Sequence, residues 1–341
     1  MIPIPQYPLY TATLAYLSAV PIPYYLQEPD NWSLSHSDLV AAVKKAKDAG
    51  TPIKALAIIN PGNPTGACLP MEAMKQVVQL CYDESLLLLA DEVYQANIFD
   101  KENKPFVSFK KVLREMPEEV ASSVELVSFH SISKGVSGEC GRRGGYFEAV
   151  NIRDDVMEQI YKMASVSLCP PITGQVSLFH THPSPFLVLM QVRRVPVKSN
   201  VARQSTPPYP FDPCRWRNTK DANAQVGVDL LVNPPKEGEP SYPLWAEQTS
   251  NTLANLKSRS LYMSERFNSL PGMSCVPADG AMYLLPKIDM PEKALKEAEK
   301  RGKKADVMYT LDLLGKSPRS VGSSAKMSIR QDGPSKRSDW S

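Results

Sequence analysis

Residues 53–66 read IKALAIINPGNPTG, an apolar run that ends in a turn rich in Asn, Pro and Gly. Two more apolar runs follow, LLLLAD at 86–91 and VELVSFH at 124–130. Runs of this length that stay apolar at most positions suit strands buried on both faces of a parallel sheet. The intervening sequence predicts helices over 70–84 and 106–116. Strands that alternate with helices predict βαβ units and an α/β fold.

The second half of the chain is less uniform in its pattern. Helices are expected over 154–164, around 244–270 and over 291–302, where proline precedes and glycine ends the helical pattern. A strand is expected at 280–285 (GAMYLL), after a turn at 278–280. The helix around 244–270 is long enough to bridge a large and a small domain.

Two stretches carry most of the positive charge and show no sustained periodicity. Residues 177–226 contain seven prolines, and their seven Lys and Arg residues outnumber two Asp. Residues 315–341 are rich in Ser, Gly and Pro and hold six Lys and Arg against two Asp. Neither stretch could bury enough apolar surface to offset its ordering entropy, so we expect both to be disordered. Charge alone would support a nucleic-acid partner, and we expect none.

The bulk composition excludes several other classes of protein. Of 341 residues, 43% are hydrophobic and 22% are charged, which is typical of a globular protein. No apolar run reaches the 18 residues that would indicate a transmembrane helix, so we expect no membrane partner. The six cysteines form no CxxC pair, and His180 and His182 have no third ligand nearby, so we expect no metal site.

Polar residues stand just beyond the end of each predicted strand. Asn63 lies in NPGNPTG after the first strand, Asp91 and Tyr94 lie in DEVY after the second, and Ser131 and Lys134 lie in SISKG after the third. In open parallel α/β sheets, ligands bind outside the carboxyl ends of the strands. We therefore expect these five side chains to converge on one crevice.

A glycine-flanked pair of arginines follows closely. GRRGG at 141–145 places Arg142 and Arg143 in a turn suited to gripping a phosphate with two hydrogen bonds. Each element alone has an ordinary interpretation: a solvated lysine, an aspartate that caps a helix, or a plain turn. Their occurrence in order, each at a strand end, favours a binding site.

Four blocks in this order, NPGNPTG, DEVYQ, SFHSISKG and GECGRRGGY, resemble the signature blocks of fold-type I, class I/II pyridoxal-phosphate (PLP) aminotransferases. The spellings SISKGVSGECGRRGGYFE and LADEVYQ most closely resemble those of alanine aminotransferases. The resemblance covers roughly residues 1–176 and 227–313. It implies an α/β fold of the aspartate aminotransferase type: a three-layer αβα large domain with a mostly parallel sheet, and an α+β small domain.

The resemblance also implies a role for each candidate site residue, with PLP as the cofactor. Lys134 matches the Schiff-base lysine, the catalytic residue that also carries the proton to and from the substrate α-carbon. Asp91 matches the carboxylate that pairs with the pyridine nitrogen. Tyr94 and Asn63 match the donors to the cofactor's phenolic oxygen, and Ser131 matches a phosphate ligand.

Arg143 is the arginine that we expect to bind the phosphate, and Arg142 is the alternative. The reaction implied is L-alanine and 2-oxoglutarate to pyruvate and L-glutamate. A homodimer is expected for the family. A cytoplasmic location is expected, with a mitochondrial one as the alternative.

By this resemblance, residues 1–176 and 227–255 form a PLP-binding large domain without its N-terminal part, and 256–314 form part of the small domain. Residues 177–226 are an insertion, or alternatively a regulatory or binding loop, and 315–341 are a basic tail. The family's phosphate-binding glycine loop and its arginine for the substrate carboxylate have no counterpart in this sequence. The alternative to an active enzyme is therefore a catalytically inactive, shortened form.

Overall fold

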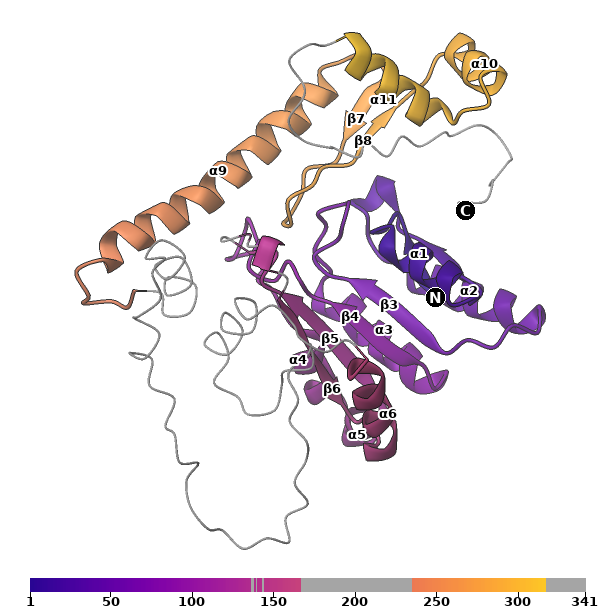
Figure 1. Ribbon diagram of the computed structural model, residues 1–341, viewed down its shortest axis with the longest axis vertical. Helices are drawn as coiled ribbons and strands as arrows, with labels where there is room; N and C mark the ends of the chain where they lie inside the picture. The colour runs from indigo at the N-terminus through magenta and orange to yellow at the C-terminus, as the bar shows by residue number, and fades with distance from the viewer. Residues whose placement is uncertain (136–137, 139, 143, 167–234, 317–341) are drawn as a thin grey trace, which may run out of the picture.

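The computed structural model describes residues 1–135, 138, 140–142, 144–166 and 235–316 (Figure 1). The stretch 177–226 and nearly all of 315–341 lie outside the described residues, so the predictions made for them stay predictions. Figure 1 shows one group of elements around a central sheet and a second group beyond the long helix α9 (Tyr242–Asn268).

The central sheet has four strands in the order β3-β4-β5-β6. The first three are β3 (Ala55–Ile59), β4 (Leu87–Asp91) and β5 (Leu126–Ser131), and they run parallel. These are the three strands that the sequence predicts. The edge strand β6 (Gly145–Val150) is antiparallel to β5 and was not predicted. The sheet is therefore mixed but mostly parallel.

Three helices that contact one another pack against the sheet: α3 (Met71–Asp83), α4 (Phe109–Glu115) and α5 (Glu118–Ser123). The first two match the predicted helices. In α3 the apolar residues recur at helical spacing, and the buried ones are Met74, Val77, Val78, Leu80 and Cys81. Helix α5 was not predicted, because its six residues are too few to show a period. Its first turn is acidic, which the helix dipole favours.

The described residues cover the two faces of the sheet unequally. Four of the five residues of β3 are buried, as expected for a strand covered on both faces. In β4, Leu88 and Ala90 are fully buried, whereas Leu87, Leu89 and Asp91 on the other face are only partly so. The expectation of burial on both faces therefore holds for β3 and not for β4 within the described part of the chain.

The N-terminal 48 residues add elements that the sequence pattern did not predict. A short parallel pair, β1 (Ile2–Ile4) and β2 (Pro23–Tyr25), flanks α1 (Leu9–Tyr16) and is followed by the 3-10 helix η1 (Glu28–Asp30) and α2 (His36–Asp48). The amide of Ala57 in β3 donates to the carbonyl of Met1, which attaches this unit to the central sheet. Ser35 caps α2 by accepting from the Asp38 amide.

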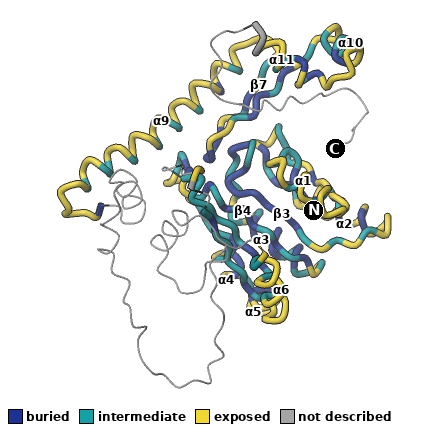
Figure 2. The backbone as a smooth tube through the Cα atoms, viewed as in Figure 1, coloured by how far each residue is buried: buried dark blue, intermediate teal, exposed yellow. Residues whose placement is uncertain are grey.

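Helix α6 (Asp154–Ala164) lies with the elements around the central sheet in Figure 1 and matches its prediction residue for residue. The second group contains the elements from α9 onward. Helix α9 and α10 (Glu292–Lys300) also match predictions, whereas α11 (Ala305–Lys316) does not appear among them. Of the α9 residues, all described, Ser264 alone is buried, and Figure 2 shows the helix exposed along most of its length. None of the described helices is both long and apolar enough to cross a membrane.

The predicted strand at 280–285 is wrong. The two strands of the small antiparallel sheet are β7 (Met273–Cys275) and β8 (Pro286–Ile288), so the strand begins where the prediction ends. Residues 280–285 instead form an irregular segment with one bridge, between Gly280 and Ile98. Its backbone amides bond to loops beyond the central sheet rather than to a neighbouring strand, which brings the second group against those loops.

Candidate active site

The loops that follow β3, β4 and β5 start side by side at one edge of the sheet. The Asn60 amide donates to the Asp91 carbonyl at 3.0 Å, and the Glu92 amide donates to the Phe129 carbonyl at 3.1 Å. These bonds continue the parallel ladders by one residue beyond the strands. The polar residues that the sequence places after each strand therefore begin from neighbouring backbone positions.

Asp91 is the last residue of β4, and its carboxylate is held by two donors. The Tyr10 hydroxyl donates to Oδ2 at 2.8 Å, and the Val93 amide donates to Oδ1 at 3.4 Å. Burial raises the pKa of Asp91, while these hydrogen bonds and the charge of Lys134 oppose that rise. A carboxylate offers about four lone-pair sites, so this one can accept a further, charged donor.

Tyr94 and Lys134 lie together, with Tyr283 from the second group beside them. The Tyr94 side chain is buried, and its hydroxyl donates to the Tyr283 hydroxyl at 3.1 Å. The two rings meet edge to face, with centroids 5.9 Å apart. Lys134 Nζ lies 5.1 Å from the Tyr94 ring centroid and 6.0 Å from that of Tyr283. Burial raises the pKa of Tyr94 above its ordinary value, so its hydroxyl stays protonated and can donate.

Ser131 ends β5 and joins it to the start of β6. Its hydroxyl donates to the Gly144 carbonyl at 3.2 Å and accepts from the Ser133 amide at 3.0 Å. Arg143 lies outside the described residues. Arg142 is described only as the last backbone position of the 3-10 helix η2 (Cys140–Arg142). The structure therefore describes the serine of the expected phosphate site without its arginine.

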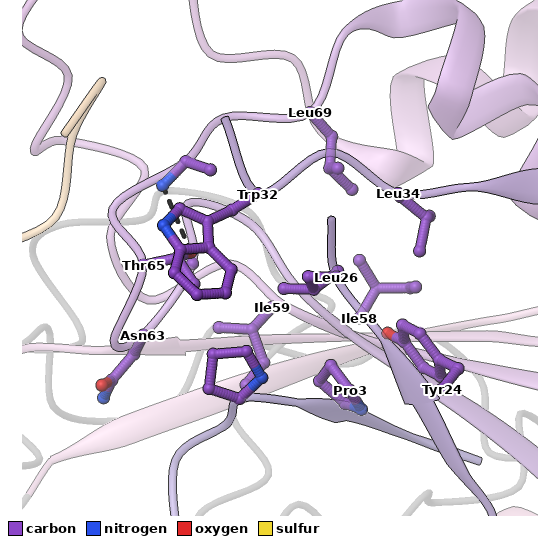
Figure 3. Close-up of a pocket in the computed structure, with 13 residues that line it drawn as sticks. Pro3, Tyr24, Leu26, Trp32, Leu34, Ile58, Ile59, Asn63, Thr65 and Leu69 are labelled. Carbon is purple, nitrogen blue, oxygen red and sulfur yellow. Dashed lines mark hydrogen bonds between the residues drawn. The ribbon is translucent and has the colours of Figure 1, made fainter. Parts of the chain in front are cut away.

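Asn63 stands apart from the other candidates. It lines a small apolar pocket with Trp32 and Thr65, and Figure 3 shows its amide directed away from the surrounding apolar side chains. Among the described residues, nothing accepts from or donates to that amide. The pocket lining includes neither Tyr94 nor Lys134. The structure thus brings Asp91, Tyr94 and Lys134 together and leaves Asn63 outside their contacts.

Three side chains at this site were missed by the sequence analysis. Tyr10 binds Asp91, Tyr283 contacts Tyr94, and the buried Asn97 bonds to Gly135, next to Lys134. Tyr10 lies in the YPLY segment at 7–10, and Tyr283 lies in the stretch read as a strand. Among the described residues, no three His, Cys, Asp or Glu side chains are placed to hold a metal ion.

A family model for aminotransferases of class I and II matches residues 1–189, more than half of this chain. The chain belongs to the class I and II aminotransferase family. Two kinds of named aminotransferase are among its relatives. Glutamate–glyoxylate aminotransferase 1 of Arabidopsis thaliana is 40% identical over 92% of this chain and 55% of that protein. Alanine aminotransferase 1 of Bos taurus is 39% identical over 92% of this chain and 53% of that protein.

A third relative, the probable mitochondrial alanine aminotransferase of Dictyostelium discoideum, is 39% identical over 92% of this chain and 49% of that protein. This aminotransferase chain therefore spans about half the length of the curated relatives it matches.

Solved structures share the fold of this aminotransferase at low sequence identity. An aminotransferase of Escherichia coli superposes with a TM-score of 0.59 at 21% identity, covering 92% of this chain and 58% of that one. An alanine aminotransferase of Pyrococcus furiosus gives 0.54 at 20% identity, covering 85% and 55%. A Thermus thermophilus aspartate aminotransferase variant gives 0.50 at 18% identity, covering 84% and 54%. The expected aspartate aminotransferase-like α/β fold is confirmed.

Proposed function

We propose that this aminotransferase chain binds PLP through Lys134 and transfers the amino group of L-alanine to 2-oxoglutarate. The observation that carries the proposal is the grouping of Lys134, Tyr94 and Asp91 at the carboxyl edge of a parallel sheet. A primary amine, a protonated phenol and a buried carboxylate are the groups that the ring half of PLP requires. The relatives' names supply alanine, and the resemblance to alanine aminotransferases supplies 2-oxoglutarate.

The donor set fits the cofactor ring on physical grounds. Burial raises the pKa of Asp91, so a cation next to it would favour its charged form. The protonated ring nitrogen of PLP is such a cation. When bound, PLP supplies an electron sink for charge that develops on the substrate α-carbon.

The chain's own residues then have separate tasks. Asp91 would hold the proton on the ring nitrogen of bound PLP, and Tyr10 keeps the carboxylate oriented by its hydrogen bond. The Tyr94 hydroxyl would turn its proton from the Tyr283 hydroxyl to an oxygen on the cofactor ring. Lys134 is the base that takes the proton from the substrate α-carbon and returns it. Ser131 and Arg143, with Arg142 as the alternative, are proposed for the phosphate, and Asn63 for the ring oxygen beside Tyr94.

The pair of amino donor and acceptor is the least constrained part of the proposal. Two relatives are named for alanine and one for glutamate and glyoxylate, at 39 to 40% identity. A glutamate–glyoxylate reaction is therefore the second candidate. Alanine and glutamate as donors, each tested with 2-oxoglutarate, pyruvate and glyoxylate as acceptors, separate the two. Turnover of glutamate with glyoxylate but not of alanine with 2-oxoglutarate would favour the second.

Assembly, location and domain division belong to the same proposal. We infer a homodimer and a cytoplasmic location from the family, with a mitochondrial location as the alternative. The large domain would comprise 1–176 and 227–255, and the small domain 256–314. Light scattering of the purified chain at several concentrations measures the assembly state, and a constant monomer mass would contradict the homodimer.

The deciding experiment maps the lysine that reacts with PLP. The purified chain is mixed with PLP, reduced with borohydride, digested and analysed by mass spectrometry. The pyridoxyl group is expected on Lys134, and it should vanish in Lys134→Ala while persisting in Lys162→Ala, an exposed lysine on α6. Labelling elsewhere, or none in a folded sample, would overturn the proposal. Labelling of Lys134 without turnover of any substrate pair would identify a form that binds PLP and is catalytically inactive.

A further inference from the structure

Asn97 is a fully buried polar residue that bonds to the backbone of Tyr94 and of Gly135, the residue after Lys134. It follows Tyr94 by three residues, and its backbone amide donates to the Tyr94 carbonyl at 2.8 Å, which closes a turn. Its side chain is 0% exposed. A buried amide without partners would cost several kcal/mol in a medium that cannot form hydrogen bonds, so its contacts decide where it can lie.

Both polar groups of the Asn97 side chain bond to one residue, Gly135. The Gly135 amide donates to Oδ1 at 3.0 Å, and Nδ2 donates to the Gly135 carbonyl at 3.4 Å. Gly135 directly follows Lys134 and has a φ of +80°, a conformation that glycine adopts without steric cost. Because the amide grips this residue on both sides, the peptide that joins Lys134 to Gly135 has one orientation.

The backbone of the same residue holds the segment from the second group. The Asn97 carbonyl accepts from the Ala281 amide at 2.8 Å, and the adjacent Ile98 bridges to Gly280. A Cβ atom at Gly280 would lie 2.4 Å from the Asn97 carbonyl oxygen, so only glycine allows this approach. Two residues beyond Ala281, the Tyr283 hydroxyl meets that of Tyr94.

We propose that Asn97 is a positioning residue that fixes the backbone at Lys134 and joins it to the 278–283 segment, so that the two positions are coupled through one residue. The role of Lys134 in this inference rests on the proposed function. The two hydrogen bonds to Gly135 and the one from Ala281 do not depend on the proposed function. Asn97 touches neither substrate nor cofactor; it acts through Lys134.

Asn268 provides a control for the hydrogen-bond pattern, because it binds one backbone residue in the same way at an exposed position. Its side chain accepts from the Cys275 amide at 2.8 Å and donates to the Cys275 carbonyl at 3.0 Å, at the junction of α9 and β7. Asn97→Leu and Asn268→Leu each remove one asparagine grip on one backbone residue. An effect specific to Lys134 should follow only the first.

The test uses the full chain and begins without PLP. Hydrogen exchange should show the Gly135 and Ala281 amides exchanging roughly tenfold faster or more in Asn97→Leu than in the wild type or Asn268→Leu. Asn97→Asp keeps an oxygen for the Gly135 amide and loses the donor to its carbonyl. It should restore protection at Gly135. Isotope-coded acetylation, normalised to Lys162, then measures the reactivity of the Lys134 amine directly. Of the two leucine variants, only Asn97→Leu should change that reactivity.

PLP is added last. Borohydride-trapped labelling of Lys134 should be about tenfold slower or more in Asn97→Leu and unchanged in Asn268→Leu, a difference of about 1.4 kcal/mol. Wild-type exchange and labelling in Asn97→Leu, or equal losses in Asn268→Leu, would overturn the inference. If Asn97→Leu does not fold, Asn97→Asp decides: loss of Gly135 amide protection in that variant, which keeps the acceptor oxygen, refutes the inference. Absence of PLP labelling in the wild type would refute the proposed function alone, because the exchange and acetylation results still test the positioning role.

Discussion

Replacing Glu92 by glutamine should stabilise the protein at pH 8 and have little effect near pH 4. Glu92 follows Asp91 and is 6% exposed. Its Oε1 accepts from the amide of Phe109, the first residue of α4, at 2.7 Å. Burial raises the pKa of Glu92 from 4.5 to about 7, the Phe109 hydrogen bond opposes that rise, and the nearby carboxylates of Asp91 and Glu148 add to it.

The magnitude follows from linkage between protonation and folding. Between pH 4.5 and about pH 7 the folded state keeps a proton on Glu92 that the unfolded state has released, so the free energy of unfolding falls as the pH rises. Each pKa unit corresponds to about 1.4 kcal/mol, so the change from 4.5 to about 7 corresponds to about 3 kcal/mol lost by pH 8. Glutamine does not ionise and can still accept from the Phe109 amide, so Glu92→Gln should avoid this loss.

The assay is urea unfolding followed by circular dichroism at pH 5, 6, 7 and 8. The control is Glu265→Gln, at an exposed position on α9. The stability difference between Glu92→Gln and the wild type should grow with pH and level off above pH 7, whereas Glu265→Gln should show no such trend. A difference that is the same at pH 5 and pH 8 would refute the assignment of a raised pKa to a buried Glu92.

Two further predictions concern backbone packing and thiol reactivity. Gly66 and Gly50 both have positive φ, but only at Gly66 would a Cβ lie 2.4 Å from another side chain. In urea unfolding, Gly66→Ala should therefore lower the free energy of unfolding by about 1–3 kcal/mol more than Gly50→Ala. Equal losses would contradict this. Burial raises the pKa of Cys68 to about 12, so iodoacetamide at pH 8 should modify the exposed Cys140 well before Cys68 by mass spectrometry. Equal rates in the folded protein would contradict the burial.

Much of the central fold could be predicted because its signals are local. The runs at 53–60, 86–91 and 124–130 are apolar enough to predict buried strands, and all three form in parallel. The edge strand β6 alternates less clearly and follows a glycine-rich turn, so its pairing with β5 depends on tertiary contacts. The segment 280–285 looks like a strand but finds its hydrogen-bond partners in loops distant in sequence, which no local pattern reveals.

The candidate site could likewise be predicted only in part. Asp91, Tyr94 and Lys134 could be expected to meet because each follows a strand of one sheet, and the structure brings them together. Tyr10 and Tyr283 reach the same place from positions 81 and 189 residues away from their partners, so sequence spacing gives no sign of them.

The exposure of most of α9 has a thermodynamic consequence. A helix of 27 residues is about 40 Å long, and this one contributes little burial to hold the second group in position. The hydrogen bonds from residues 279–281 to the Gly66 and Asn97 carbonyls, here called the attachment, therefore do much to hold the second group in position. The attachment lies near Lys134. A ligand that binds more tightly when the attachment is closed must, by reciprocity, also favour one orientation of α10 and α11. Ligand occupancy at the edge of the central sheet and the orientation of α10 and α11 would then report the same equilibrium.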